Sequence, residues 1–461
     1  MITIKNYNFD YFRYLFITSG IILFGILLKV FDKRPYVLIE TALLTFGLLF
    51  ALIYLSDNKK ELIGTSKIFL LFLIYLFIFN LSMVFLRPFE VDVTFFDALF
   101  FSIQEFRLST LGYFLPLLFL PIAFYERDKV VTIFITLAKI AIAYTIFEQV
   151  VSMIGFRTFF ESLYYNSGVV TSNQIGVKSF GIYRIWGLIG SPQILGVFHI
   201  MTLALMLHSK EYIWAFLSGL CIFLSTSKTA ILILILLLFL YLLVNRRYLL
   251  FILTSMLVFL IGFTLYSISE HMVATMSTDY PHIQKFVQSI QGYFYIMINE
   301  IDINHEIEVR YVNETGALMK IYEYFRLNPL ELFFGKGITY SFMTTTTLSQ
   351  SVFAEPDTRI NDLFYLGLSS DFYILTFFEQ YGIFGTLFLL IIYLAYPMIL
   401  LFKRHSYILY IPITFFLATF HYPPQISKII MLFLAFSIWM IYLRSDKSND
   451  KIMTNKYQWL K

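Results

Sequence analysis

The sequence predicts an all-α polytopic membrane protein, with about twelve transmembrane helices and one long external loop that contains short helices. Three observations lead to this prediction. Of the 461 residues, 59% are hydrophobic and 14% are charged, whereas soluble globular proteins carry roughly 25% charged residues. Apolar runs of about 20 residues recur along the chain, and each is long enough to cross a bilayer as a helix. One long polar stretch, 269–370, interrupts this pattern late in the chain.

The candidate spans follow from length and hydropathy. In chain order they are 14–30, 36–55, 68–86, 108–124, 130–154, 185–207, 212–226, 229–244, 249–267, 381–402, 407–420 and 429–443. Two shorter apolar pieces, 95–106 and 373–378, are candidates for interfacial or re-entrant segments. Lys5 and Arg13 precede the first run without a small-residue cleavage site, so this run is expected to be an uncleaved first span.

The spans and the polar stretch divide the chain into four parts. Residues 1–268 hold about nine of the predicted helices and 371–443 about three. Residues 269–370 form the external loop, and 444–461 form a short polar tail. Long loops without spans of their own are usually functional. Inside this loop, apolar residues at helical spacing before Pro329 predict a helix that lies along the membrane surface.

The Lys and Arg residues predict the orientation of the chain in the membrane. Basic residues are enriched in the cytoplasmic loops of membrane proteins. When the N-terminus is placed in the cytoplasm and the long loop is left out, more Lys and Arg fall on cytoplasmic segments than on outer ones, and the cytoplasmic ones include the short turns at Arg246-Arg247 and Lys403-Arg404. We therefore expect both termini in the cytoplasm and the long loop outside, where there is no nucleotide pool.

Several other functions are disfavoured by the composition. The net charge of +4 is too small to indicate a nucleic-acid partner, and the single cysteine, Cys221, excludes an intrachain disulfide and a cysteine-based metal site. His199 and His421 stand singly in spans, where a packed, hydrogen-bonded histidine is expected rather than a ligand. Lys139 and Glu148 are charges inside a span, which fits either a functional role or a paired structural one. We expect no metal and no cofactor.

Arg184 is the first candidate site residue. It stands before a stretch that contains Gly187, Gly190 and Pro192, at the predicted outer end of a span. A helix broken by Gly and Pro at membrane depth is tolerated where it is buried in protein or lines a water-filled cavity, and broken helix ends commonly form ion sites. The alternative is an arginine that reaches the interface and has no further role.

Lys228 is the second candidate, in a tight turn between two spans that also contains Ser225, Thr226, Ser227 and Thr229. A lysine at the end of a span is commonly an interfacial anchor. Because hydroxyl groups flank it here, it could also hold a phosphate as a point charge.

The other two candidates belong to the long loop and its far junction. Arg310 stands at the start of the predicted loop helix, where it either pairs with Glu306 or Glu314 or grips a pyrophosphate with two parallel hydrogen bonds. Asp371 stands at the far edge of the loop, before apolar sequence that contains Gln380, Gly382 and Gly385. It either caps a helix or serves as a base, or as a group that orients one.

Four stretches carry a resemblance to a known family: RIWGLIGSPQILGVF, LSTSKTAILILIL, EVRYVNETGALMKIYEYFRLNPLELFFGKG and SSDFYILTFFEQYGIFG. Together and in this order they resemble the O-antigen polymerase and ligase superfamily of bacterial glycan-assembly membrane proteins. The resemblance covers about residues 180–400. Lys228 stands where many relatives carry Arg. Ser370-Asp371 stands where the ligase branch typically carries a His-Asn pair, which favours a polymerase over a ligase.

The resemblance implies a metal-independent glycosyltransferase of the bacterial cytoplasmic membrane. Such an enzyme joins oligosaccharide repeat units, carried on undecaprenyl pyrophosphate, into O-antigen, capsule or exopolysaccharide at the outer face of that membrane. Arg184, Lys228 and Arg310 would bind the pyrophosphate, and Asp371 would act on the attacking sugar hydroxyl, with Arg310 as its catalytic partner. The implied partners are the lipid-linked oligosaccharides, the bilayer and a chain-length regulator protein. The alternatives are a ligase-type glycan transferase and a flippase for the same lipid-linked units.

Overall fold

The computed structural model describes residues 10–57, 67–86, 99, 103, 106–122, 126–167, 178–179, 182–260, 329–335, 373–420 and 424–442. In this part of the chain the elements are helical except for one antiparallel pair of two-residue strands, β1 (Lys178–Ser179) and β2 (Ile182–Tyr183). The expectation of an all-α protein is therefore confirmed for the described residues.

Three of the described helical segments are long and apolar enough to cross a membrane by length and composition: Lys33–Ser56, Arg127–Asn166 and Gln380–Arg404. Shorter apolar helices accompany them: Tyr11–Leu23, Lys67–Ile78, Pro192–His208, Tyr212–Leu224, Lys228–Val244, Tyr248–Leu260, Tyr407–Ala418 and Lys428–Tyr442. Most of the predicted runs are thus apolar helices, although many are shorter than the run that predicted them.

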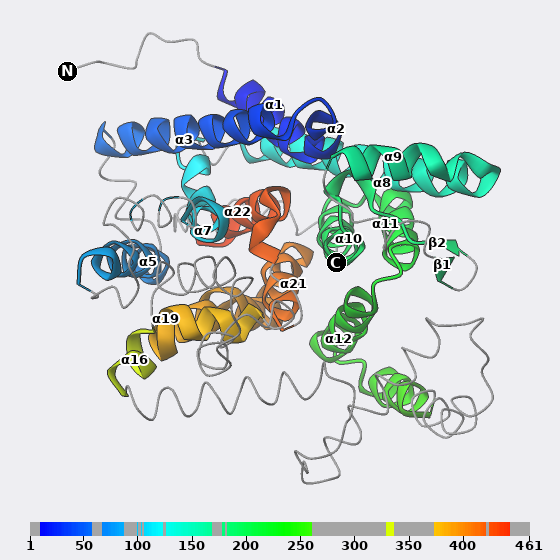
Figure 1. Ribbon diagram of the computed structural model, residues 1–461. Helices are drawn as coiled ribbons and strands as arrows, with labels where there is room; N and C mark the ends of the chain where they lie inside the picture. Colours follow the sequence, from blue (N-terminus) through cyan, green and yellow to red (C-terminus); the bar gives the residue numbers. More distant parts are fainter. Residues whose placement is uncertain are drawn as a thin grey trace, which may run out of the picture.

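The N-terminal helices lie together along one side of the molecule (Figure 1). They are α1 (Tyr11–Leu23), α2 (Gly25–Lys29) and α3 (Lys33–Asp57), and α5 (Lys67–Leu86) follows. The predicted span 14–30 is divided between α1 and α2, which meet at Phe24.

The predicted span 108–124 is not one regular helix, and this expectation was wrong. The chain forms a π-helix at Phe106–Thr110, a single α-turn α7 at Leu111–Phe114 and a 3-10 helix at Leu115–Phe119. Pro116 contributes to the change because it has no backbone N–H to donate to the preceding turn. Hydropathy found the buried segment but not its backbone geometry.

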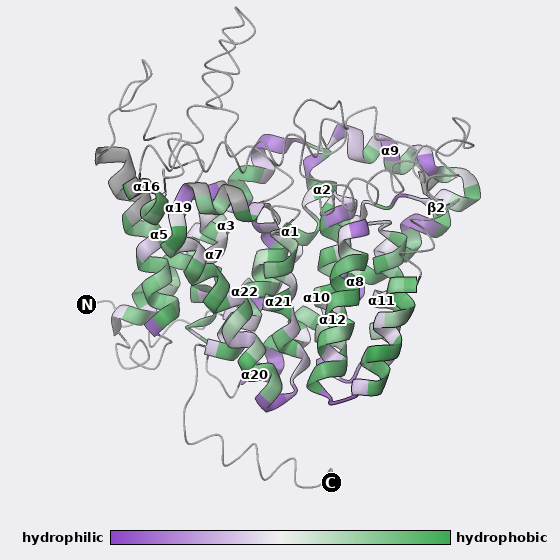
Figure 2. Ribbon diagram, turned by 90° about the horizontal axis from the view of Figure 1, so that it is seen from below, coloured by the Kyte–Doolittle hydropathy of each residue, from purple (hydrophilic) through white to green (hydrophobic). Residues whose placement is uncertain are grey.

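α8 (Arg127–Val151) covers the predicted span 130–154 and ends in a change of direction. Gly155, with φ of 108°, interrupts the helical backbone inside a π-helical segment, Ser152–Phe156. The chain then forms α9 (Arg157–Asn166). In Figure 2, α9 lies across the end of the bundle, whereas α8 runs along it.

Consecutive short turns connect the next helices, which run in alternating directions. α10 (Pro192–His208), α11 (Tyr212–Leu224), α12 (Lys228–Val244) and the helix Tyr248–Leu260 follow one another. The rings of Phe239 and Phe251, 5.6 Å apart, pair across the turn that follows α12.

Among the C-terminal helices, the last one that the structure describes lies in the centre of the molecule (Figure 1). They are α16 (Pro329–Phe334), α19 (Tyr373–Leu390), a π-helix (Ile391–Ala395), α20 (Tyr396–Arg404), α21 (Tyr410–Ala418) and α22 (Lys428–Tyr442). Almost every residue of α22 is buried. Phe134 of α8 stacks on its Phe436 at 4.7 Å and meets Phe433 edge-on at 4.9 Å. A helix that is apolar on all sides is stable only when its neighbours cover it completely.

Two opposite edges of the bundle carry the polar turns, as the hydropathy colouring of Figure 2 shows. At one edge, Ser406 after α20 lies 3.4 Å from His208 at the end of α10, and Lys139 of α8 pairs with Glu211 at 3.0 Å. We call this the His208 edge. Because α10 runs from Pro192 to His208, its other end defines the opposite, Arg184 edge.

Of the predicted loop 269–370 the structure describes only α16 and Gly335, and the predicted tail 444–461 lies outside the described residues. The division into four parts therefore stays a prediction.

Candidate functional site

Arg184 lies in an irregular segment between β2 and α10. The predicted span 185–207 begins too early, because a 3-10 turn at Gly187–Ile189 precedes the helix and α10 starts only at Pro192. Gly187 and Gly190 adopt positive φ angles of 60° and 83°, which side chains other than glycine rarely adopt. Regular helix is thus excluded between Arg184 and Ser191 by the glycines, and Pro192 at the first helical position favours a new start there.

The segment after Arg184 is held by a buried carboxylate of α8. Glu148 is fully buried, and its two oxygens accept hydrogen bonds from the backbone amides of Trp186 at 3.2 Å and Gly187 at 2.8 Å. The Tyr164 hydroxyl donates to the same carboxylate at 2.5 Å, and Arg157 Nη1 donates at 3.2 Å. An ionised carboxylate accepts about four hydrogen bonds, so this one is fully satisfied.

Arg157 connects the same carboxylate to Arg184. Its Nη1 pairs with Glu148, while its Nη2 donates to the backbone carbonyl oxygen of Arg184 at 3.1 Å. Its Nε lies 3.5 Å from Glu161, one turn later on α9, and its guanidinium lies over the Tyr183 ring at 5.4 Å. All of these contacts use a single planar guanidinium, which carries five N–H donors in a rigid fork.

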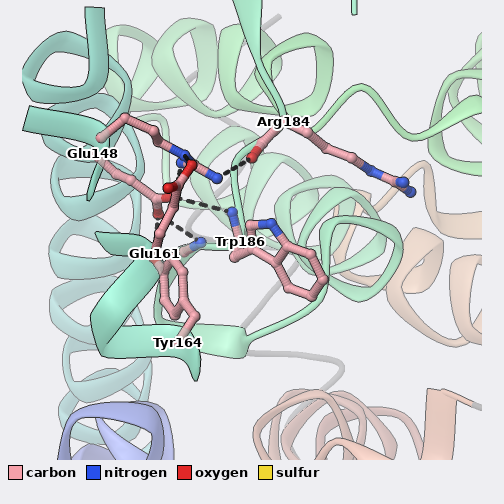
Figure 3. Close-up of polar contacts among 7 residues, drawn as sticks. Glu148, Glu161, Tyr164, Arg184 and Trp186 are labelled. Carbon is pink, nitrogen blue, oxygen red and sulfur yellow. Dashed lines mark hydrogen bonds and ion pairs between the residues drawn. The ribbon is translucent and has the colours of Figure 1, made fainter. Parts of the chain in front are cut away.

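The Arg184 side chain extends away from this cluster, while its carbonyl oxygen faces it (Figure 3). The guanidinium is partly buried, and within the described part of the chain its Nε has no hydrogen-bond partner. Burial lowers the pKa of the Arg184 guanidinium from its usual value, although arginine stays charged at neutral pH. A desolvated cation with a donor left over is suited to bind an anion.

The turn that carries Lys228 packs against the first turns of α10. A Cβ atom added at Gly196 would lie 2.8 Å from Ser225 Oγ, 3.1 Å from Ser227 Cβ and 2.5 Å from Ala230 Cβ. Ser227 caps α12 by accepting from the Ala230 amide at 3.2 Å, and Lys228 is the exposed first residue of that helix. The structure therefore brings the second predicted site to the same edge as Arg184.

The described part of the long loop, α16 (Pro329–Phe334) and Gly335, makes a tight backbone contact with α19. α19 is broken at Gly382, whose φ is 63°, and a Cβ atom there would lie 2.4 Å from the carbonyl oxygen of Phe333 in α16. A Cβ atom at Gly335 would lie 2.4 Å from the Gln380 carbonyl oxygen. The Tyr75 hydroxyl donates to the Tyr381 carbonyl at 2.7 Å. The described part of the loop, α16 and Gly335, is thus seated on the break in α19.

Two predicted site residues, Arg310 and Asp371, lie outside the described residues, so the structure does not test their assignment. The predicted short piece 373–378 is the start of α19 rather than a separate segment. Its first residue, Tyr373, donates or accepts a hydrogen bond with Tyr113 at 3.2 Å between the hydroxyl oxygens.

The sequence interpretation did not single out Arg157 or Tyr164. The signal that leads to them is Glu148, an acidic residue in an apolar run, because a buried carboxylate needs donors. Lys139, the other charge in that run, pairs with Glu211 rather than with Glu148.

His199 is a packed histidine, as expected. It is fully buried between Thr145, 3.0 Å from Nε2, and Thr202, 3.5 Å from Nδ1. Among the described residues, no group of three or more His, Cys, Asp or Glu side chains is arranged to hold a metal ion.

Comparison with protein-family models, with curated proteins and with solved structures finds no match to this chain.

Proposed function

We propose that this protein is a polysaccharide polymerase of the bacterial cytoplasmic membrane. It joins oligosaccharide repeat units carried on undecaprenyl pyrophosphate, at the outer face of that membrane. The proposal rests on the sequence resemblance described above and on how the described residues are arranged at the Arg184 edge.

The observation that carries the proposal is that four features share one edge of the bundle. Arg184 and the start of α10 define this edge, and Gly196 packs against the turn before Lys228. The helix Tyr248–Leu260 follows α12 in the reverse direction, so Leu260 returns to the edge where α12 began. The apolar helix Gln380–Arg404 ends just before Ser406 at the His208 edge, so its start, where Gly382 contacts α16, lies at the opposite edge. α16, the described part of the loop that contains Arg310, therefore stands at the same edge as Arg184 and Lys228.

This edge suits a pyrophosphate leaving group. α10 and α12 both begin there, and the N-terminus of a helix carries a partial positive charge. Lys228 at the first position of α12 adds a full positive charge to an end that already disfavours cations. Fixed positive charges where negative charge develops in the transition state are commonly the largest contribution to catalysis.

The chemical step requires no nucleotide. A hydroxyl oxygen of the acceptor sugar attacks the anomeric carbon of the donor, and the bond from that carbon to the pyrophosphate oxygen breaks. The lipid pyrophosphate leaves with the bonding electrons, stabilised by Arg184, Lys228 and Arg310. Asp371 orients the attacking hydroxyl or accepts its proton. Both substrates are anchored in the bilayer, so a site at one edge of the bundle meets both.

The same arrangement supports the orientation. Arg127, Lys210 and Arg247 lie at the His208 edge, together with Arg246, Lys403 and Arg404. The positive-inside rule then places this edge in the cytoplasm. In the full proposal the chain has about twelve spans with both termini inside.

The experiment that tests the proposal measures surface polysaccharide by gel in cells that carry single substitutions. Arg184→Ala, Arg310→Ala and Asp371→Ala are expected to abolish long chains, while the protein level in the membrane stays unchanged. Arg247→Ala removes an exposed cation from the His208 edge and is the matched control. Normal chain length in both Arg184→Ala and Arg310→Ala cells contradicts the site assignment.

Cells that lack the protein distinguish the three related functions. A polymerase leaves surface material with a single repeat unit, and its lipid-linked units accumulate on the outer leaflet. A flippase leaves these units on the inner leaflet, and a ligase leaves long chains that are not attached to their acceptor. Either of the last two results replaces the proposed function.

A further inference from the structure

We infer that Glu148, Arg157 and Tyr164 form a positioning cluster that sets where Arg184 stands at its edge of the bundle. The geometric part of this inference stands on the contacts alone. Its chemical consequence, that pyrophosphate binding depends on the cluster, rests on the proposed function.

The cluster holds the backbone at Arg184 and directly after it. Arg157 Nη2 donates to the carbonyl oxygen of Arg184 itself at 3.1 Å. Glu148 accepts from the backbone amides that follow, those of Trp186 at 3.2 Å and Gly187 at 2.8 Å. Hydrogen bonds that involve a charged group are stronger than neutral ones. Consecutive peptide groups are thus held by one buried ion pair.

The segment has little other support from regular structure. It lies between a two-residue strand and a three-residue 3-10 turn, so few backbone hydrogen bonds of its own hold it. A Cβ atom at Gly187 would lie 2.6 Å from Leu195 Cδ1, so the backbone approaches α10 closely. The segment can therefore move only when the hydrogen bonds between Glu148 and its backbone amides break.

The burial of the cluster separates its role from a catalytic one. The Glu148 side chain is 0% exposed and that of Arg157 is 6% exposed. Their hydrogen-bonding groups are turned to each other, to Tyr164, to Glu161 and to the backbone. The Arg184 side chain points the other way (Figure 3). The cluster can therefore act on a bound anion only through Arg184.

Arg157→Lys is the informative substitution. Lysine keeps the positive charge beside the buried Glu148 carboxylate, but it lacks the fork that reaches Glu148 and the Arg184 carbonyl together. Tyr164→Phe is a second, milder change, because it removes only the hydroxyl that donates to Glu148. Neither residue is part of the proposed pyrophosphate site.

The test uses thiol labelling and needs no substrate. Arg184→Cys leaves the carbonyl of residue 184 in place for Arg157, and the native Cys221 is fully buried, so the protein without an added cysteine is the blank. The full chain in detergent is labelled with a soluble maleimide. Loss of a hydrogen bond to a charged group is expected to raise the labelling rate of the thiol at position 184 about tenfold when Arg157→Lys is added. Adding Tyr164→Phe instead should give a smaller rise.

Two controls separate a local effect from general destabilisation. Lys139→Gln breaks another ion pair of α8, the one with Glu211 at the opposite edge, and should leave the labelling rate at position 184 unchanged. A Lys228→Cys reporter should label at the same rate with and without Arg157→Lys. The inference is overturned if the rate at position 184 stays within about twofold of the parent with both Arg157→Lys and Tyr164→Phe. A parallel rise at position 228 overturns it as well.

The positioning role of the cluster and the proposed function can fail separately, and the experiments distinguish the two failures. If labelling at position 184 rises as expected but Arg184→Ala cells still make long polysaccharide, the cluster positions Arg184 and the pyrophosphate assignment falls. If Arg157→Lys leaves both labelling and polysaccharide length unchanged while Arg184→Ala abolishes long chains, the proposed function stands and the positioning role falls.

Discussion

Glu148 shows why one side chain can decide a local backbone conformation. A carboxylate buried without donors carries a large desolvation penalty, which only hydrogen bonds and an opposite charge offset. Its donors come from the next helix, α9, and from the segment that leads to α10: Arg157, Tyr164, Trp186 and Gly187. The same contacts that stabilise the charge also connect three segments of the chain.

Replacement of Arg157 by leucine should therefore be costly. The change leaves Glu148 buried and without its charge partner, and we expect the protein to lose about 3–5 kcal/mol of stability. The measurement is thermal unfolding in detergent at fixed lipid content.

Lys139→Leu is the control for that prediction. Lys139 and Glu211 are 29% and 38% exposed, so their pair is screened by solvent and its loss should cost only about 0–1 kcal/mol. Equal losses from the two substitutions would show that burial does not distinguish the pairs.

Helix contacts in this protein depend on glycine where backbones approach closely. Gly196 lets α10 pack against the turn between α11 and α12, which brings Arg184 and Lys228 to one edge. Gly335 and Gly382 likewise allow the backbones of α16 and α19 to approach each other closely. Small residues are enriched at helix interfaces in membranes for this reason.

Gly196→Ala should separate α10 from the turn before α12. Its new Cβ would stand 2.5 Å from that of Ala230, and such overpacking typically costs about 1–3 kcal/mol. Gly219 in the neighbouring α11 is the matched control, because no atom lies within 4 Å of its added Cβ. Gly219→Ala should leave the melting temperature unchanged or raise it, since alanine favours helix over glycine.

Gly335→Ala should release α16 from α19. The new side chain would meet the Gln380 carbonyl at 2.4 Å, and φ of 77° is strained for any residue with a Cβ. Hydrogen exchange of the α16 amides should become faster, while exchange in α22 stays slow. Unchanged protection of α16 would mean that the contact is not needed to hold it.

The molecule as a whole has its polar turns at two edges and a buried helix, α22, between them. Arg184 and Lys228 stand at one edge, and the turns with Lys210 and Arg247 stand at the other. When the protein spans a membrane, the residues of one edge face the outside and those of the other edge face the cytoplasm.

The proposed orientation predicts opposite labelling of two exposed positions in intact cells. Lys228→Cys should react with a membrane-impermeant maleimide added outside, and Arg247→Cys should react only after the cells are permeabilised. Native Cys221 is buried and serves as the silent background. The reverse pattern would place Arg184 in the cytoplasm and end the proposal of an outward-facing polymerase.

Hydropathy along the chain was sufficient to find most of the apolar helices. The runs 212–226, 229–244 and 429–443 agree closely with α11, α12 and α22, because length and apolar content are local properties. Hydropathy did not predict the backbone of 108–124, where an apolar segment forms π, α and 3-10 turns in place of one α-helix. It also did not predict where α10 starts, because the positive φ angles of Gly187 and Gly190 keep the chain out of a helix until Pro192.

The partners of the buried charges came only from the folded chain. Glu148 was visible in the sequence as a charge in an apolar run, but its donors lie 9, 16, 38 and 39 residues further on. The meeting of Gly196 with the turn before Lys228 is likewise a contact between separate elements. Composition and periodicity report what each segment is, whereas side-chain partners depend on how the segments pack, and that is a property of the whole chain.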